Sequence, residues 1–188
     1  PVFVSDWPLV LLPVQIAFLE LIIDPACSVV FEAEPADPQI MNQPPRGLGE
    51  PMFGRRVLTI AFLQGASVLA AVLGAYLWAL FSGRSGEEVR SLTFATLVVG
   101  NVALILVNRS WRLSILRSFK ERVNHMLYWI LALAAAVLVL LLAVPGVRAA
   151  FHFGRMTWLE GLIALGAGFV GVLWFEMYKA LSVRGRKG

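Results

Sequence analysis

The chain has 188 residues, of which 59% are apolar and only 15% are charged. A soluble domain usually carries about 45–50% apolar and about 25% charged residues, so one globular core cannot bury this excess and a lipid bilayer is the expected second apolar solvent. The formal net charge is +4, but the basic residues lie in the short gaps between apolar runs, so nucleic acid is not an expected partner. Cys27 is the single cysteine, which excludes an internal disulfide framework.

Five stretches are long and apolar enough to cross a membrane, since a spanning helix needs roughly 20 mostly apolar residues. None of them shows the alternation of a barrel strand. We therefore expect an all-α, polytopic transmembrane bundle of about five helices with short loops, forming a single membrane domain over residues 1–188. The expected spans, in chain order, are 9–31, 57–81, 92–107, 126–144 and 158–181.

The first stretch is the most polar of the five because it carries Glu20 and Asp24. Their spacing of four residues puts both carboxylates on one helical face, one turn apart. Pro25 follows directly, and a proline should break or unwind the helix there, which would free backbone carbonyls. Carboxylate and carbonyl oxygens are the ligands of hard cations, and acids at this depth usually mark an ion path or proton relay. The sequence thus predicts an ion or proton site at Glu20 and Asp24.

Two plainer readings of the acidic pair stay open. The two carboxylates would pair with basic groups elsewhere in the protein, or the segment would not be embedded in the membrane. An intramembrane enzyme using Glu20 and Asp24 as acid and base is disfavoured, because it needs a second cluster of polar groups at the same depth and the sequence offers none.

The other polar residues within the spans have structural interpretations. Gln64 and Asn101 are expected to form hydrogen bonds between helices. Glu176 is expected to pair with Lys179, three residues further on. Cys27 is interpreted as a small packing residue. Close helix packing is also expected at three small-residue pairs: Ala70 with Gly74, Ala164 with Gly168, and Ala167 with Gly171.

The loops set the expected topology. The segment 32–56 is rich in proline and is predicted to be an extended, ordered loop in the cytoplasm. If every stretch spans, twelve Lys and Arg residues fall on the side of this loop and four on the other. Because basic residues concentrate in cytoplasmic loops, the N-terminus is expected outside and the C-terminus in the cytoplasm.

Several catalytic signatures are absent from the sequence. There is no Gly-x-x-x-x-Gly-Lys-Ser/Thr phosphate loop, no Gly-x-Gly-x-x-Gly and no Gly-x-Ser-x-Gly. The chain by itself therefore has no visible machinery for ATP.

A series of motifs at near-fixed spacing runs through the first quarter of the chain. They are Leu12-Pro13-Val14-Gln15-Ile16, Glu20-Leu21-Ile22-Ile23-Asp24, Glu34-Pro35-Ala36-Asp37-Pro38, Ile40-Met41 and Pro44-Pro45-Arg46. The series resembles the sixth transmembrane helix and following loop of the calcium-type P-type cation-transporting ATPases. The remainder is similar more loosely, through Arg55-Arg56, Val144-Pro145 and Glu176-Met177-Tyr178-Lys179, which would make the chain helices six to ten of such a pump.

The resemblance implies roles for three residues. Asp24 falls on the family's ion-binding aspartate, and Glu20 falls where calcium pumps commonly have an asparagine ligand. Asn101 lies near the position where some calcium pumps carry a glutamate, so it is a possible third ligand. Ile23 replaces a common threonine and Pro25 a common glycine, and these departures leave the cation open between calcium, a proton and another ion.

The resemblance also implies a larger machine. The family's Asp-Lys-Thr-Gly-Thr phosphorylation motif, its Thr-Gly-Glu motif and helices one to five are absent here. ATP and magnesium would serve the intact pump, and this segment would hold no cofactor and have no enzymatic activity alone. A chain that starts at Pro1 is expected to belong to a longer multi-pass protein of a bacterial plasma membrane, with lipid and the rest of the pump as partners. The alternative is a free-standing membrane scaffold or regulatory protein, or a degenerate pump remnant without transport.

Overall fold

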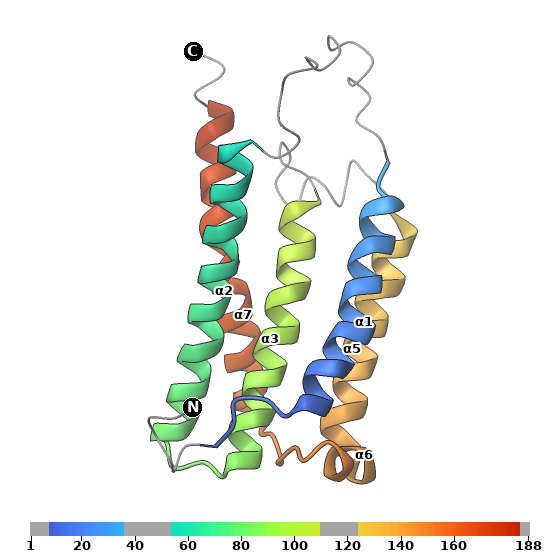
Figure 1. The fold of residues 1–188 in the computed structure, drawn as a ribbon, viewed down its shortest axis with the longest axis vertical. Coiled ribbons are helices and arrows are strands. Elements are labelled where there is room, and N and C mark those ends of the chain that lie inside the picture. The colour runs from blue at the N-terminus through green and yellow to red at the C-terminus, as the bar shows by residue number, and fades with distance from the viewer. Residues whose placement is uncertain (1–7, 36–53, 110–123, 185–188) are drawn as a thin grey trace.

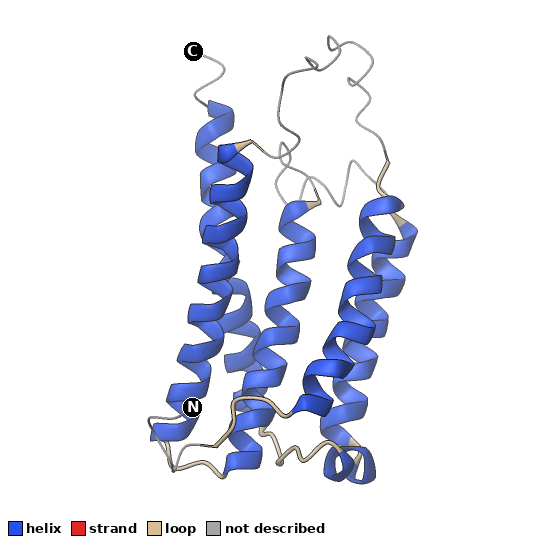
Figure 2. Ribbon diagram, in the orientation of Figure 1, coloured by secondary structure: helices blue, strands red, loops and turns tan. Residues whose placement is uncertain are grey.

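The computed structural model describes residues 8–35, 54–109 and 124–184 (Figure 1). These residues are helical with short connections, and no strand occurs within the described ranges (Figure 2). The helices are α1 (Pro13–Glu32), α2 (Arg55–Phe81), α3 (Gly86–Asn108), α5 (His125–Ala143), α6 (Pro145–Ala150) and α7 (Trp158–Arg184). The five long helices are each apolar and long enough to cross a membrane, which confirms the expected bundle.

The long helices lie side by side and α3 is central (Figure 1). It packs against α1, α2, α5 and α7, while α1 also packs on α5 and α2 on α7. We call the end that holds α6 and the α2–α3 turn the α6 end, and the opposite end the C-terminal end (Figure 1).

Local capping places the helix starts away from the predicted span limits. The first span was expected from residue 9, but α1 begins at Pro13, whose fixed φ suits the first helical position. The third was expected from residue 92, but α3 begins at Gly86. There the Ser85 hydroxyl accepts from the Glu88 amide at 3.4 Å, and the Glu88 carboxylate accepts from the Ser85 amide at 2.9 Å.

Pro25 does not break α1, so this prediction is wrong. The helix runs without interruption from Pro13 to Glu32 with Pro25 inside it. One proline removes a single backbone hydrogen bond, and the turns on either side keep theirs, which transmembrane helices tolerate. The helix is therefore not unwound beside Glu20, and the single carbonyl that Pro25 deprives of its i→i−4 donor is that of Leu21.

The fourth span was expected to end at residue 144, which is close to the observed end of α5, but a further element follows it. α5 ends at Ala143, and Pro145 occupies the first position of the short helix α6. Most of the predicted proline-rich loop, residues 36–53, lies outside the described residues, and helix occupies both its predicted edges at Glu32 and Arg55.

Glycines allow α3 to approach its neighbours closely. A Cβ atom on Gly168 of α7 would lie 2.6 Å from Val99 Cγ1 and 2.9 Å from the Gly100 nitrogen. A Cβ on Gly171 would lie 3.3 Å from Ala71 Cβ. The packing predicted at these two glycines is confirmed. At Gly74 nothing in the described chain lies within 4 Å of such an atom, so the packing expected there stays a prediction.

Candidate functional site

Glu20 lies near the middle of α1, on a face that the rest of the described chain leaves uncovered. The helix packs through Gln15, Leu19 and Val30, which are buried, whereas Glu20 is exposed. Within the described part of the chain, Glu20 has neither an ion pair nor a hydrogen bond. Asp24 follows one helical turn later in α1, and its side chain lies outside the described ones.

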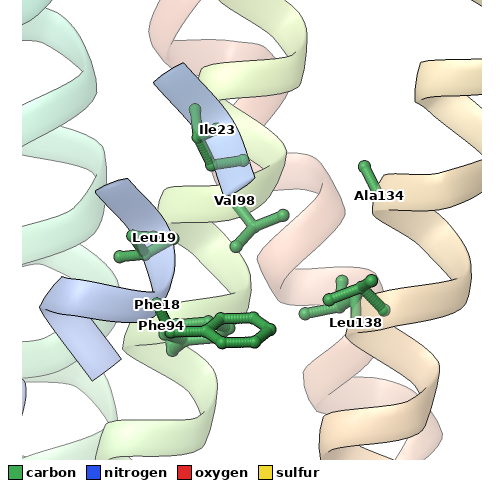
Figure 3. A pocket seen from close by; sticks show the side chains of 8 residues that line it. Phe18, Leu19, Ile23, Phe94, Val98, Ala134 and Leu138 are labelled. Carbon is green, nitrogen blue, oxygen red and sulfur yellow. The ribbon is translucent and has the colours of Figure 1, made fainter. Parts of the chain in front are cut away.

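The covered face of α1 offers no ligand at this level. A small cavity of about 20 Å³ lies between α1, α3 and α5, and its lining is entirely aliphatic and aromatic (Figure 3). It is lined by Phe18, Leu19, Ile23, Phe94, Val98, Ala134, Val137 and Leu138. Because Leu19 and Ile23 flank Glu20 in sequence, oxygen ligands to a cation at Glu20 would have to come from the uncovered side.

Asn101, the possible third ligand, lies on α3 beside a groove between α2 and α3. The groove is otherwise apolar and includes Val68, Leu97 and Leu104. Asn101 is half-buried, and its amide has no hydrogen-bond partner among the described residues, so the interhelical bond predicted for it is not formed there. The structure records no contact that joins Asn101 to Glu20. Where the chain is described, no three His, Cys, Asp or Glu residues gather as a metal site.

Two of the other predicted roles are confirmed and one stays open. Gln64 Nε2 donates to Asn108 Oδ1 at 3.2 Å, and Asn108 Nδ2 donates to Gln64 Oε1 at 3.1 Å, which joins α2 to α3. Cys27 packs against the cluster around Val30. The pair of Glu176 with Lys179 stays a prediction, because the Lys179 side chain lies outside the described ones.

A polar cluster at the C-terminal end is not predicted by the sequence. Arg109 Nε donates to Glu34 Oε2 at 2.6 Å, and Asn124 Nδ2 donates to the same oxygen at 3.1 Å and to the Val30 carbonyl at 3.2 Å. Arg109 and Asn124 are buried, and the Glu34 side chain is 11% exposed. This Glu34 cluster joins the ends of α1 and α3 to the start of α5. Its members lie too far apart in sequence to leave a local pattern.

The α6 end has a second polar attachment of α1. Gln15 is fully buried, and its Nε2 donates to the Phe151 carbonyl at 2.8 Å while its Oε1 accepts from the Leu12 amide at 2.9 Å. The Phe18 and Phe151 rings meet edge to face with centroids 5.2 Å apart. The Gln15 of the Leu-Pro-Val-Gln motif therefore fixes the start of α1 against the segment that follows α6.

An ion pair lies at the same end, where α7 begins. Arg84 Nε lies 3.0 Å from Glu160 Oε1, and Glu160 Oε2 accepts from the Thr157 amide at 2.7 Å and hydroxyl at 2.9 Å. The Thr157-x-x-Glu160 spacing matches a helix-capping motif, so this contact could be predicted from the sequence.

Comparison with known proteins gives the family. The family described as "Cation transporting ATPase, C-terminus" matches residues 8–181. Calcium-transporting ATPase 1 of Lactococcus lactis subsp. lactis (strain IL1403) is 23% identical over 170 residues, which are 89% of this chain and 19% of that relative. The chain thus spans less than a quarter of that relative's length. With five membrane-length helices and a match that covers nearly all of it, this chain belongs to the family of cation-transporting ATPase C-termini.

Proposed function

We propose that this chain is the C-terminal transmembrane part of an ATP-driven cation pump, in which Glu20 and Asp24 contribute carboxylate ligands to a cation site within the membrane. The observation that carries the proposal is Glu20, exposed and unpaired within the described chain near the middle of an apolar helix. A charged residue at the centre of a membrane helix costs about 2.5–3.5 kcal/mol on insertion scales. Glu20 therefore needs polar surroundings, which the apolar side chains of α3 and α5 that contact α1 at this level do not provide.

The remainder of the pump is the proposed source of those surroundings. Since the chain spans 19% of its calcium-transporting relative, most of a protein of that length would lie outside it. Helices of that remainder would cover the face of α1 that carries Glu20 and would bring further oxygen ligands. Asn101 is proposed as a ligand from α3, because its amide has no partner in the described chain.

The chemistry divides between the two parts of such a pump. ATP and magnesium would be handled by cytoplasmic parts outside this chain, which would have no ATPase activity alone. Carboxylate and amide oxygens suit a hard cation such as calcium, and a carboxylate also suits a proton. The cargo is therefore proposed as calcium, a proton or another hard cation.

The test is the cation dependence of ATP hydrolysis by the full-length protein. The assay would compare wild type with Glu20→Gln and Asp24→Asn over calcium, sodium and pH series. Glu32→Gln is the matched control, because Glu32 is an exposed acid at the end of the same helix. Loss of one charged ligand should raise the activating cation concentration at least roughly tenfold, since hydrogen bonds and contacts to charged groups contribute about 1.5–3 kcal/mol. Glu32→Gln should leave it unchanged.

An unchanged cation response in both Glu20→Gln and Asp24→Asn would contradict the proposed site. Hydrolysis with no cation response in the wild type, or no hydrolysis at all, would favour the scaffold or pump-remnant alternative.

We also propose that the C-terminal end faces the cytoplasm and the α6 end the outside of a bacterial plasma membrane, as the basic-residue bias indicates. In intact cells, a membrane-impermeant maleimide should label Gly146→Cys, an exposed position with open space around it at the α6 end. Arg55→Cys should be labelled only after permeabilisation. The reverse pattern would invert the topology.

A further inference from the structure

A groove runs along the bundle between α5 and α7 at the α6 end, with α3 as its floor. It has a volume of about 430 Å³. Ala95 and Val99 of α3 form the floor, Leu138 and Leu142 belong to the α5 wall, and Leu162 belongs to the α7 wall. The groove exists because α5 and α7 each pack on α3 but not closely on one another.

The groove is short. Its α7 wall extends from Trp158 to Leu165, which is about two helical turns, or roughly 10 Å. A single extended hydrocarbon chain fits this length and matches the apolar lining.

Groups that suit a lipid headgroup lie at the start of the α7 wall and directly before the lining residue Met156. Trp158 is 79% exposed at the start of α7, as in the aromatic belt of a membrane interface. Arg155 precedes it by three residues, is exposed, and has no ion pair among the described residues. Arg84, by contrast, is paired with Glu160. An exposed guanidinium without an ion pair in the described chain, three residues before an exposed tryptophan, is suited to bind a phosphate.

We propose that this groove binds one phospholipid of the leaflet at the α6 end, with an acyl chain between α5 and α7 and its phosphate on Arg155. The apolar lining supplies the hydrophobic contact, and Arg155 supplies the charge complementarity.

The test is a lipid titration of the full-length protein, delipidated in detergent and followed by native mass spectrometry. The probes are phosphatidylglycerol and phosphatidylethanolamine with acyl chains of ordinary length. Gly161→Leu would fill the groove, since a Cβ there meets only Met156 Cε at 3.8 Å. Gly166→Leu is the control, because Gly166 lies on the same helix in open space and outside the lining.

The wild type and Gly166→Leu should each retain one tightly held phospholipid. Gly161→Leu should weaken that binding roughly tenfold or more, which corresponds to the lost burial of about two methylene groups. Arg155→Gln should weaken it roughly fivefold, as expected for one basic side chain near a phosphate, and Arg155→Lys should restore most of it.

Equal lipid retention in Gly161→Leu and Gly166→Leu would overturn the groove as the site. Equal retention in Arg155→Gln and wild type would overturn the headgroup contact. Stoichiometric recovery of a membrane-spanning polypeptide, lost in Gly161→Leu, would replace the lipid by a partner helix.

Discussion

α1 and α5 are both poorly covered by the rest of the described chain, yet their uncovered faces differ in chemistry. Only 25% of the span window of α1 and 11% of that of α5 are buried, against 67% for α3. α5 has no charged side chain between His125 and Ala143, whereas the exposed face of α1 carries Glu20. A helix face without charge suits lipid, and one with an unpaired carboxylate does not. Low burial therefore has two different causes in this bundle: the α5 face suits lipid, and the α1 face needs polar neighbours.

The attachment of α1 explains how its middle stays uncovered. α7 packs on α3 along the bundle through contacts such as that of Gly168 with Val99. α1 is held by polar contacts near its two ends, through Gln15 at the α6 end and the Glu34 cluster at the C-terminal end. Between them the contact with α3 and α5 is apolar. This arrangement fixes the axis of α1 while leaving one face of its middle open.

The largest expected loss of stability comes from removing the ion pair that attaches the end of α1 to α3. Arg109→Gln would leave the mostly buried Glu34 carboxylate without its cation, and removing one partner of a buried ion pair costs about 3–5 kcal/mol. Thermal denaturation of the protein purified in detergent should show a clear loss of stability. Arg55→Gln, an exposed arginine at the same end, should leave the melting temperature unchanged. Equal effects of the two substitutions would contradict a structural role for the cluster.

A charge on the uncovered face of α5 should lower the yield of folded protein, because that face is expected to meet lipid. Leu133 is 52% exposed near the middle of α5, and an aspartate at such a depth costs about 2.5–3.5 kcal/mol on insertion scales. Leu133→Asp should therefore reduce the amount of protein that is inserted and folded, as measured by detergent-extracted monodisperse protein. The opposite change, Glu20→Leu, should not reduce it. If Leu133→Asp is tolerated, α5 does not face lipid.

A smaller effect is expected at the closely packed α3–α7 contact. Gly168→Ala would place a Cβ 2.6 Å from Val99 Cγ1 and 2.9 Å from the Gly100 nitrogen, and overpacking of this kind costs about 1–3 kcal/mol. Gly166→Ala has open space around it and should be neutral or slightly stabilising, because alanine favours the helix. The two melting temperatures should therefore move in opposite directions or differ by several degrees.

The smallest expected change in stability concerns the hydrogen bonds between Gln64 of α2 and Asn108 of α3. A double-mutant cycle of Gln64→Leu and Asn108→Leu should give a coupling near the average for interhelical hydrogen bonds in membranes, about 0.6 kcal/mol. A coupling of zero would show that the two amides do not bond in the membrane.

The sequence predicts the helices well because long apolar runs need no tertiary information. The first and last residues of the helices depend on capping residues, which the apolar composition does not indicate. Ser85 with Glu88 adds six residues to the start of α3, and Pro145 starts α6 instead of only ending α5. The expected break at Pro25 failed because one missing hydrogen bond does not outweigh the intact turns around it.

The candidate site is predictable only in part. The i, i+4 spacing of Glu20 and Asp24 identifies a polar helical face, and the structure adds that Glu20 is uncovered. The contact of Glu34 with Arg109 joins residues 75 positions apart, so no local pattern reveals it. The position of Gln15 in a recognisable motif marked it as notable, but its bond to the Phe151 carbonyl depends on how two distant segments pack.

The most direct test of the difference between α1 and α5 is photo-crosslinking in the full-length protein. A diazirine analogue of leucine would replace Leu21, which is 73% exposed beside Glu20, or Leu133 of α5, which is 52% exposed. After irradiation in native membranes, mass spectrometry should find crosslinks from position 21 to peptides outside residues 1–188 of the same protein, and from position 133 to lipid. Crosslinks from position 21 to lipid alone would contradict the claim that this face of α1 meets the rest of a pump.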